Sequence, residues 1–384
     1  MKKSRFEKSP IGHIVPAYKG EFAFVPSPLP RALNLSSSVV SQLDRASRAV
    51  SVLAGIGETL PNPHLLIRPF LRREAVLSSM IEGTQTSISE LFMYEASSSK
   101  RKPAGDAQEV INYVHALERG LELLKALPLS VRLFNEIHQV LMQGVRGRER
   151  HPGELRTEQV WIGTEGTLIG DARFVPAPPD QVRDLLTDLE VFLNEDLEMP
   201  PLVRCALMHY QFETIHPYFD GNGRVGRLLI VLYLCAANVL PTPLLYLSAY
   251  LERNRQQYYD QLNELSATGN WEAWLLFFLA GVEEQSNDAI VRSRRVRNLQ
   301  DSYRKLLQKE RASGNTLSLL DALFESPFMT PGSAAKILGV TWVGAKGVLE
   351  RLRRAGVVER TDKGQIMYVA RDLLRMIEAP SGEG

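Results

Sequence analysis

The sequence predicts a mainly α-helical protein with one small β-hairpin and a separate C-terminal module. Three observations support this prediction. Apolar residues recur at helical spacing over most of the chain, and short apolar runs alternate with glycines between residues 159 and 175. Residues 316–378 carry their own pattern of helix, turn, helix and strand. Because 384 residues exceed one ordinary core, we expect two or three domains.

The composition is that of a soluble globular protein, with 44% hydrophobic residues and a net charge of +1. The two cysteines, Cys205 and Cys235, lie in apolar helical patterns, which argues against a disulfide framework or a zinc site and fits a reducing cytoplasm. The basic N-terminus lacks the apolar stretch of a secretory signal, and the longest apolar run, residues 228–239, is too short to cross a bilayer. We therefore expect a cytoplasmic protein without membrane contact.

The N-terminal third begins as an irregular chain and becomes helical. Residues 1–35 are rich in proline and predict an extended arm on the surface. Helical periodicity starts at Ser36, and residues 69–91 predict one or two short helices. Residues 97–106, rich in Lys, Ser, Gly and Pro, predict a loop or linker.

The middle of the chain is helical around the hairpin. Helical spacing covers residues 107–144 and 180–193, and a proline cluster at residues 176–179 ends the hairpin between them. Helices at 202–214 and 224–238 flank a polar loop with glycines. Residues 289–312 predict a long basic helix that Gly314 breaks. We therefore divide the chain into an arm and helical region (1–104), a helical core (105–288), a basic linker helix (289–315) and the C-terminal module (316–384).

The loop between the two central helices reads HPYFDGNGRVGR, from His216 to Arg227. Gly221 and Gly223 allow a tight turn whose N–H groups point inward and form an anion-binding nest. The helix that follows adds the positive end of its dipole. Arg224 and Arg227 are three residues apart, so both can face the nest. These features predict a polyphosphate site.

Two further residues of the loop predict the chemistry. Asp220 offers a hard oxygen ligand, which suits Mg²⁺ bridging phosphates. His216 can accept the proton of an incoming hydroxyl. A glycine loop by itself is usually only a turn, and a lone histidine is usually packed in a core. Together, however, these residues predict phosphoryl or nucleotidyl transfer.

The loop resembles the signature of the Fic family, His-Pro-Phe-x-Asp/Glu-Gly-Asn-Gly-Arg-x-x-Arg, and departs from it only at Tyr218. The resemblance implies a Fic helical core and a protein adenylyltransferase that uses ATP and Mg²⁺ to place AMP on a Ser, Thr or Tyr hydroxyl of a protein target and of itself. It implies that His216 is the general base, Asp220 the metal ligand and Arg227 the γ-phosphate ligand. The other nucleotide-binding residues it implies in this loop are Gly221, Asn222, Gly223, Arg224, Val225 and Gly226.

The predicted hairpin at residues 159–175 resembles the flap of the family, which pins an extended target segment beside the catalytic loop through main-chain hydrogen bonds. Ile162 and Gly163 would then border the nucleotide. Tyr258 and its neighbour Tyr259 fall where family members place an aromatic ring against adenine, and Tyr258 is the one predicted to contact the nucleotide. The alternatives are a hairpin that only covers the core and a tyrosine packed inside it.

Residues 78–83 resemble the inhibitory motif of the family, Ser/Thr-x-x-x-Glu-Gly/Asn. Ser78 and Glu82 are one helical turn apart and share a face. The resemblance implies that Glu82 pairs with Arg227 and so blocks productive ATP binding. The alternative is an ordinary exposed glutamate on a helix. Because relatives of this class often pair, a homodimer is a further expectation.

The C-terminal module resembles a winged helix. A short helix at 332–338, a turn at Gly339 and a second helix at 342–354 fit helix-turn-helix geometry, and strands at 357–360 and 366–369 joined across 362–364 would form the wing. DNA phosphates could bind to Lys346, Arg351, Arg353 and Arg354. The start of the second helix, at Trp342, suits base edges poorly, so a protein partner is equally open. The alternative function is a nucleotide-sensing, DNA-binding transcriptional regulator.

Overall fold

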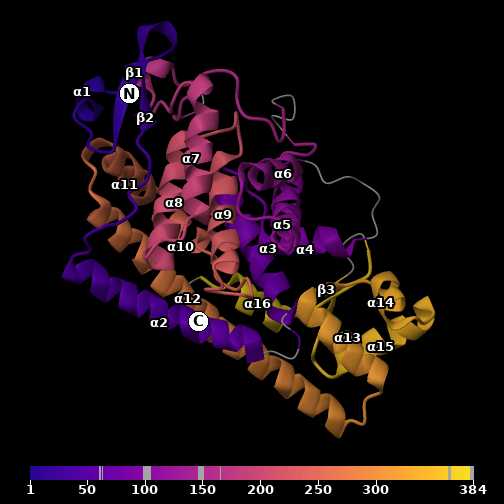
Figure 1. Ribbon diagram of the computed structural model, residues 1–384. Coiled ribbons are helices and arrows are strands. Elements are labelled where there is room, and N and C mark those ends of the chain that lie inside the picture. The colour runs from indigo at the N-terminus through magenta and orange to yellow at the C-terminus, as the bar shows by residue number, and fades with distance from the viewer. Residues whose placement is uncertain are drawn as a thin grey trace.

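The computed structural model describes residues 1–59, 62, 64–97, 105–145, 151–164, 166–361 and 365–380. Helices dominate it, as the sequence predicts (Figure 1). None of the described helices is long and apolar enough to span a membrane. Two small antiparallel sheets complete the fold, one near the N-terminus and one in the C-terminal module.

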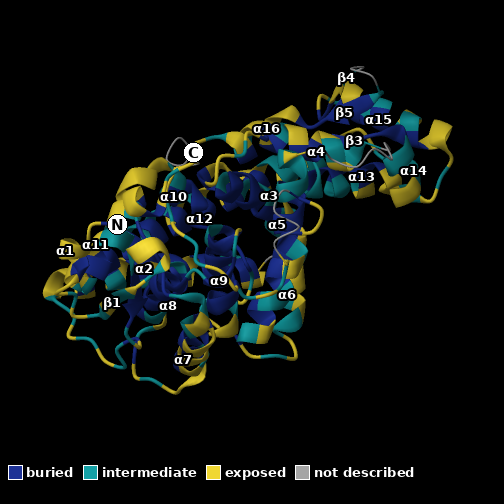
Figure 2. Ribbon diagram, turned by 90° about the horizontal axis from the view of Figure 1, so that it is seen from above, coloured by how far each residue is buried: buried dark blue, intermediate teal, exposed yellow. Residues whose placement is uncertain are grey.

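Two antiparallel helices, α8 (Pro201–Ile215) and α9 (Asn222–Ala236), form the centre of the core. Both are buried on nearly all sides, as expected for helices that are apolar around their circumference (Figure 2). The helices that contact this pair include α3 (His64–Ile81), α5 (Asp106–Leu123), α6 (Val131–Leu141), α7 (Val182–Asn194) and α11 (Arg255–Thr268), and α10 (Ser248–Arg253) packs on α3. The catalytic-loop candidate is therefore the connection between the two most buried helices.

The long helices α2 (Ser37–Thr59) and α12 (Trp271–Lys309) lie side by side along one edge of the core (Figure 1). Helix α12 runs for 39 residues without interruption. The predicted boundary between residues 288 and 289 therefore falls inside a helix. Helix α4 (Ile88–Ala96) begins at a capping box in which Ser87 and Glu90 satisfy each other's backbone N–H groups.

The prediction of an irregular N-terminal arm is wrong for part of residues 1–35. This segment contains a short helix α1 (Lys3–Phe6) and a β-hairpin, in which β1 (Gly12–Pro16) pairs with β2 (Phe22–Pro26). The prolines stand at strand ends, where they interrupt no ladder. The rings of Phe6, Phe24 and Phe174 pack against one another with centroids 5.6–6.0 Å apart. This aromatic cluster anchors the arm to the candidate flap.

The candidate flap is less regular than the predicted hairpin. Ile162 and Phe174 form one isolated antiparallel bridge, and residues between them include a short 3₁₀ turn, Ile169–Asp171. Glycines at 163, 166 and 170 weaken a strand here because they lose more conformational entropy on ordering. On its other side, Phe24 donates its N–H to the carbonyl of Val175, at 2.9 Å. The flap is thus supported by the N-terminal hairpin.

In the C-terminal module, the described residues 314–361 and 365–378 form four helices and a three-stranded antiparallel sheet. Its helices are α13 (Gly314–Glu325), α14 (Pro331–Leu338), α15 (Trp342–Arg354) and α16 (Arg371–Glu378). Its strands are β3 (Phe328–Met329), β4 (Glu359–Thr361) and β5 (Met367–Val369), in the order β3-β5-β4. The predicted turn at residues 362–364 lies outside the described residues, so the winged-helix assignment stays a prediction.

Candidate active site

The loop between α8 and α9 is held rigidly by its own side chains. His216 caps the C-terminal end of α8 with a left-handed backbone (φ 52°, ψ 62°), and Gly221 (φ 75°) caps the N-terminal end of α9. The Asn222 carboxamide bridges the loop, because it accepts from the N–H of Tyr218 and donates to the carbonyl of Tyr218, both at 2.8 Å. These two hydrogen bonds close the turn between α8 and α9.

Tyr218 occupies the position where the Fic signature has phenylalanine. Its ring is fully buried and stacks on His138, with centroids 3.8 Å apart and planes within 5°. Its hydroxyl donates to Oδ1 of Asn135 at 2.8 Å. The extra oxygen is thus satisfied, and a buried tyrosine fits without an unpaired polar group.

His216 is in the form that a general base requires. Its imidazole lines a cavity, and burial together with the nearby Arg156 lowers its pKa to about 4, so the ring is neutral near pH 7. Nδ1 lies 3.4 Å from the carbonyl oxygen of Glu213. Because a carbonyl can only accept, Nδ1 carries the proton and Nε2 keeps its lone pair.

The cavity has a volume of about 950 Å³, large enough for a nucleotide. It brings together sequence-predicted residues that lie far apart in the chain, namely Glu82, Ile162, Gly163, His216, Gly223 and Arg227. Tyr259, the neighbour of the predicted Tyr258, also lines it. Residues that the sequence does not mark individually complete its wall: Thr164, Thr167, Asp171, Arg173, Phe174, Glu213, Thr214, Arg255, Gln256, Leu262, Asn263 and Ser266.

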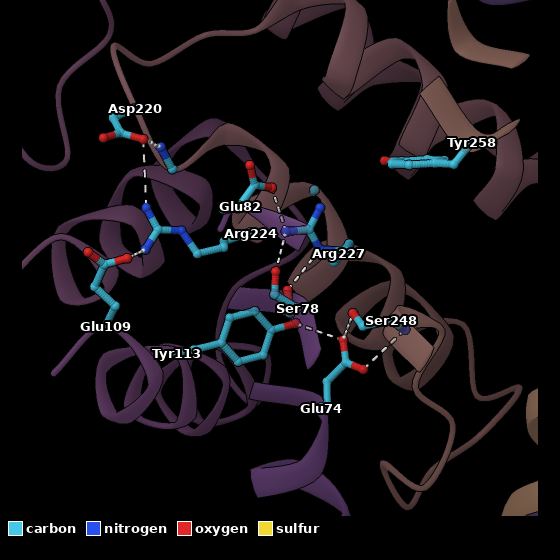
Figure 3. Close-up of polar contacts among 12 residues, drawn as sticks. Glu74, Ser78, Glu82, Glu109, Tyr113, Asp220, Arg224, Arg227, Ser248 and Tyr258 are labelled. Carbon is cyan, nitrogen blue, oxygen red and sulfur yellow. Dashed lines mark hydrogen bonds and ion pairs between the residues drawn. The ribbon is translucent and has the colours of Figure 1, made fainter. Parts of the chain in front are cut away.

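Arg227 is the central cation of this cavity, and carbonyl, hydroxyl and carboxylate oxygens surround it (Figure 3). Its Nη2 lies 2.7 Å from Oε1 of Glu82. Its Nε donates to the hydroxyl of Ser78 at 2.8 Å, and Nη2 also donates to the Ser78 carbonyl at 2.9 Å. Burial acts to raise the pKa of Glu82, but the Arg227 guanidinium outweighs it and leaves that pKa below its ordinary value.

The Glu82 carboxylate lies against the first turn of α9. A Cβ placed on Gly223 would come within 2.3 Å of Oε1 of Glu82. This contact puts the carboxylate at the N-terminal end of α9, where the helix dipole favours an anion. Glu82 therefore occupies the place that the sequence predicts for phosphate.

A buried carboxylate that the sequence reasoning missed supports Ser78 from below. Glu74, one helical turn before Ser78, accepts from the hydroxyl of Tyr113 at 3.0 Å and from the hydroxyl and N–H of Ser248 at 2.5 and 3.2 Å (Figure 3). Burial raises the pKa of Glu74. The i to i+4 spacing of Glu74 and Ser78 was the available signal. Through this network α3 is tied to α5 and α10.

Arg224 does not line the cavity, contrary to the expectation that both arginines face the nest. Its Nη1 donates to Glu109 on α5 at 2.8 Å, and Nη2 lies 3.7 Å from Asp220 (Figure 3). The long side chain reaches a carboxylate outside the loop, which spacing within the loop cannot reveal. Among the other implied residues, Val225 is packed in the core, and Gly226 accepts a hydrogen bond from His209.

Tyr258 lies in the core rather than in the cavity. It is 1% exposed and its hydroxyl donates to Nε2 of His209 at 2.8 Å. Its neighbour Tyr259 lines the cavity instead. Successive residues on a helix point about 100° apart, so only one of the two rings can face the cavity. The ring of Tyr259 lies beneath the guanidinium groups of Arg173 and Arg255.

Glu213 is a second carboxylate in the cavity wall. Burial raises the pKa of Glu213 to about 7. The nearby Arg227 acts to lower this pKa, and the nearby Glu82 acts to raise it. Its Oε1 is buried without a hydrogen-bond partner among the described residues. A Cβ on Gly226 would come within 2.2 Å of that oxygen, so glycine at 226 makes room for the carboxylate.

Asp220 is the one candidate metal ligand of the loop. Its side chain is 47% exposed, and Oδ1 accepts from the N–H of Gly221 at 2.6 Å. The described residues contain no cluster of three His, Cys, Asp or Glu that could hold a metal by itself. A single exposed carboxylate fits Mg²⁺ that is shared with substrate phosphates and water, which is how this ion commonly binds.

Two of the predicted DNA-contact residues on α15 have partners inside the protein. Arg351 donates to the carbonyl of Glu310 at 2.7 Å, and Arg353 pairs with Glu350 at 2.8 Å. Lys346 lies over the ring of Trp342, which is 46% exposed. Neither DNA nor a protein partner is favoured by these contacts.

The sequence matches two family descriptions: "Fic/DOC family N-terminal" over residues 40–122 and "Fic/DOC family" over residues 128–234. A probable protein adenylyltransferase of Aquifex aeolicus is 25% identical over 300 residues, which cover 72% of this chain and 79% of that protein. Protein adenylyltransferase fic-1 of Caenorhabditis elegans is 36% identical over 91 residues, which cover 23% of this chain and only 16% of the relative. The chain thus spans a minor part of the nematode relative.

Solved structures agree on the fold. A Fic family protein from Desulfovibrio desulfuricans superposes with a TM-score of 0.58 at 19% identity, covering 88% of this chain and 97% of that one. A fragment of Fic-1 from C. elegans gives a TM-score of 0.50 at 24% identity, covering 66% of this chain and 72% of that one. The loop geometry, the sequence matches and the shared fold together establish that this chain belongs to the Fic/DOC family.

Proposed function

We propose that this protein is an adenylyltransferase that moves AMP from ATP to a hydroxyl side chain of a protein. The observation that carries the proposal is that a neutral His216 and the buried cation Arg227 line the same cavity, at the N-terminus of α9. A proton acceptor next to an anion site is what nucleotidyl transfer to a hydroxyl requires. The names of the relatives, protein adenylyltransferases, support the same reaction.

The reaction follows from the protonation state of His216. Nε2 accepts the proton of the target hydroxyl as its oxygen forms a bond to the α-phosphorus of ATP. The bond between that phosphorus and the bridging oxygen to the β-phosphate breaks, and pyrophosphate leaves. The developing negative charge is stabilised by Arg227 and by the N-terminal amides of α9. The products are the AMP-modified protein and pyrophosphate.

Mg²⁺ is the cofactor that Asp220 suits, as a single carboxylate beside the phosphate site. When bound, the ion would neutralise phosphate charge. The loop holds Asp220 ready for this role. His138 accepts the N–H of Gly153 at Nδ1, so its Nε2–H donates to the carbonyl of Asp220 at 3.1 Å. Arg224 and Gly221 approach the carboxylate itself.

The flap offers an edge on which a target segment can add as a strand. The N–H and carbonyl of Ile162 face Phe174 and Arg173 across the bridge. Because successive residues of an extended segment point their backbone groups to opposite sides, those of Trp161, next to the bridge, would be open to a target strand. Main-chain bonding at this edge would align a target hydroxyl with His216 and ask little of the target sequence.

We also propose that the Glu82–Arg227 pair inhibits the enzyme. Glu82 engages the cation that the γ-phosphate would need, and its carboxylate lies over Gly223 in the anion site. A bound triphosphate would have to displace a charge-assisted hydrogen bond in a buried setting, where such bonds are strong. ATP could therefore bind productively only after Glu82 has moved.

The test uses ATP labelled at the α-phosphate with Mg²⁺, and follows label on protein for the parent chain, Glu82→Gly and Glu82→Gly/His216→Ala. We expect strong labelling for Glu82→Gly and a loss of at least about 100-fold when His216 is also replaced. Label at the γ-phosphate should not transfer. Equal labelling with and without the His216 side chain would refute the proposed reaction.

A further inference from the structure

The C-terminal module packs on α3, the helix that leads to Glu82. Helices α13 and α16 both contact α3, and β3 contacts the neighbouring α4 (Figures 1 and 2). Ser78 lies near the end of α3, and Glu82 follows its last residue. The same helix thus carries the contacts with the C-terminal module and the residues that engage Arg227.

One connection is an ion pair near the start of α3. Nη1 of Arg68 lies 2.8 Å from Oε2 of Glu325, the last residue of α13. The two side chains are 51% and 26% exposed, so the pair is accessible to substitution without opening a core. Pro69 lacks an N–H and weakens the helix next to this pair. A second connection beyond the proline is therefore needed to reach Ser78.

That second connection is a buried arginine at the centre of α12. Arg292 donates to the carbonyls of Met376 and Ala379, which lie at the C-terminal end of α16. It also forms a two-pronged pair with Asp288 at 2.9 and 3.1 Å. Asp288 in turn lies 4.0 Å from Nη1 of Arg73 on α3. The chain of contacts therefore joins α16, α12 and α3 on the Ser78 side of Pro69.

From Arg73 the helix continues without interruption to Ser78, about 7.5 Å along its axis. A helix of this length moves as a unit, because bending it would break backbone hydrogen bonds. A displacement at Arg73 must therefore shift Ser78 and the turn that holds Glu82. Only small shifts are needed, since the Glu82–Arg227 contact is a single ion pair of 2.7 Å.

We propose that the C-terminal module, through α13 and α16, holds α3 in the position that pairs Glu82 with Arg227. A ligand that draws the module away from α3 would then release Arg227 and switch on the active site. The inference rests on the proposed function, and it assigns the module a regulatory role over that site. It requires no contact between the module and the nucleotide cavity.

The experiment reverses one charge at the interface. Glu325→Lys places two cations together at the Arg68 position, and Arg68→Glu/Glu325→Lys restores the pair with its charges exchanged. The matched control is Glu195→Lys, which reverses one charge of the Arg31–Glu195 pair (36% and 39% exposed) just after the end of α7, away from α3. Each variant is made in the full-length parent chain and in Glu82→Gly.

We expect Glu325→Lys to raise self-labelling several-fold in the parent chain and to add nothing in Glu82→Gly. The exchanged pair should return labelling to the parent rate, and Glu195→Lys should not alter it. An unchanged rate for Glu325→Lys, or an equal rise in both backgrounds, overturns the proposal. In the second case the effect does not pass through Glu82.

A second measurement separates this inference from the proposed function. Hydrogen exchange of peptides covering residues 76–83 reports the stability of the end of α3 without any reaction. Faster exchange there in Glu325→Lys than in Glu195→Lys supports the coupling, and equal exchange overturns it. If exchange changes but Glu82→Gly never labels protein, the proposed function fails while the coupling stands.

Discussion

The carboxylate of Glu82 lies 2.7 Å from the guanidinium of Arg227 and directly over Gly223. The lack of a side chain at Gly223 leaves room for an anion at the N-terminal end of α9. The cation that the proposed reaction needs for its substrate is therefore engaged by the protein's own carboxylate. Because Arg227 is buried, leaving its guanidinium without an anionic partner would be energetically costly. In the proposed inhibited state, Glu82 and the γ-phosphate of ATP would compete for Arg227.

The charge of Glu82, and not only its bulk, should control activity. Glu82→Gln keeps the size of the side chain but loses the ionic attraction to Arg227, so we expect self-labelling between those of the parent chain and Glu82→Gly. Glu82→Gly should raise the labelling rate about tenfold or more over the parent chain. A tenfold change corresponds to the loss of about 1.4 kcal/mol of inhibitory interaction. Labelling rates with α-labelled ATP measure this order. A parent rate equal to that of Glu82→Gly would contradict it.

Ser78→Ala should weaken the inhibited state without abolishing it. The hydroxyl of Ser78 accepts from Arg227 at 2.8 Å in a fully buried setting, and a hydrogen bond to a charged group contributes about 1.5–3 kcal/mol. We expect a modest rise in labelling, smaller than for Glu82→Gly, and a lower Tm. Ser79→Ala is the matched control, because its buried hydroxyl has no hydrogen-bond partner among the described residues. Similar effects of the two substitutions would rule out the specific role of Ser78.

The pH dependence of transfer should reflect the lowered pKa of His216. The base is the neutral imidazole, which is present above a pKa of about 4, so the rate falls only as pH drops through that value. In Glu82→Gly the acidic limb of the pH–rate profile should shift to still lower pH, because the Glu82 charge acts to raise the pKa of His216. The rate of Glu82→Gly between pH 3.5 and 8, with the fold monitored by circular dichroism, checks this expectation. An acid limb near the ordinary histidine value of about 6.5 would count against it.

Removal of Mg²⁺ should stop transfer, and Asp220→Asn should raise the Mg²⁺ concentration that half-maximal transfer needs. The reason is that Asp220 is the only carboxylate of the loop and is half exposed beside the phosphate site. Because it is not buried, the substitution should leave the Tm nearly unchanged. Titration of Mg²⁺ against the rate in the Glu82→Gly background is the measurement. An unaltered Mg²⁺ requirement in Asp220→Asn would remove the metal role from this residue.

The two adjacent tyrosines should separate binding from stability. Tyr259 lines the cavity, and stacking of a base on an aromatic ring is worth about 1–3 kcal/mol, so Tyr259→Ala should weaken ATP binding about tenfold or more. Tyr258→Phe removes the donor to His209 in the core and should lower the Tm while ATP affinity is retained. Calorimetric binding and thermal melts on both variants, made in Glu82→Gly, decide the matter. The reverse pattern would restore Tyr258 as the base-contacting residue.

The geometry of the candidate site agrees best with the sequence prediction where its residues lie within one short segment. The loop from His216 to Arg227 needs no long-range information, since its glycines, arginine and histidine converge by local geometry. The contact of Glu82 with Arg227 spans 145 residues and was still predicted, because a second short motif marks it. The helical character of the core was likewise readable from apolar spacing.

The predictions that failed depended on where long side chains and helix faces meet their neighbours. Arg224 pairs with Glu109, which lies 115 positions away in the sequence, so the loop sequence alone could not predict this contact. On α11, Tyr259 lines the cavity, whereas the predicted Tyr258 points into the core. The N-terminal hairpin was obscured by prolines that stand harmlessly at its strand ends. Each of these depends on tertiary packing.

The left-handed backbone at His216 has a consequence for how the site is maintained. A residue with a Cβ pays about 1 kcal/mol for a φ of 52°, whereas glycine adopts this conformation freely. Glycine would thus be favoured at this position if folding were the only requirement. A histidine here lowers the stability of the folded state. The fold accepts this backbone strain at the turn between α8 and α9, where the imidazole of His216 reaches the cavity.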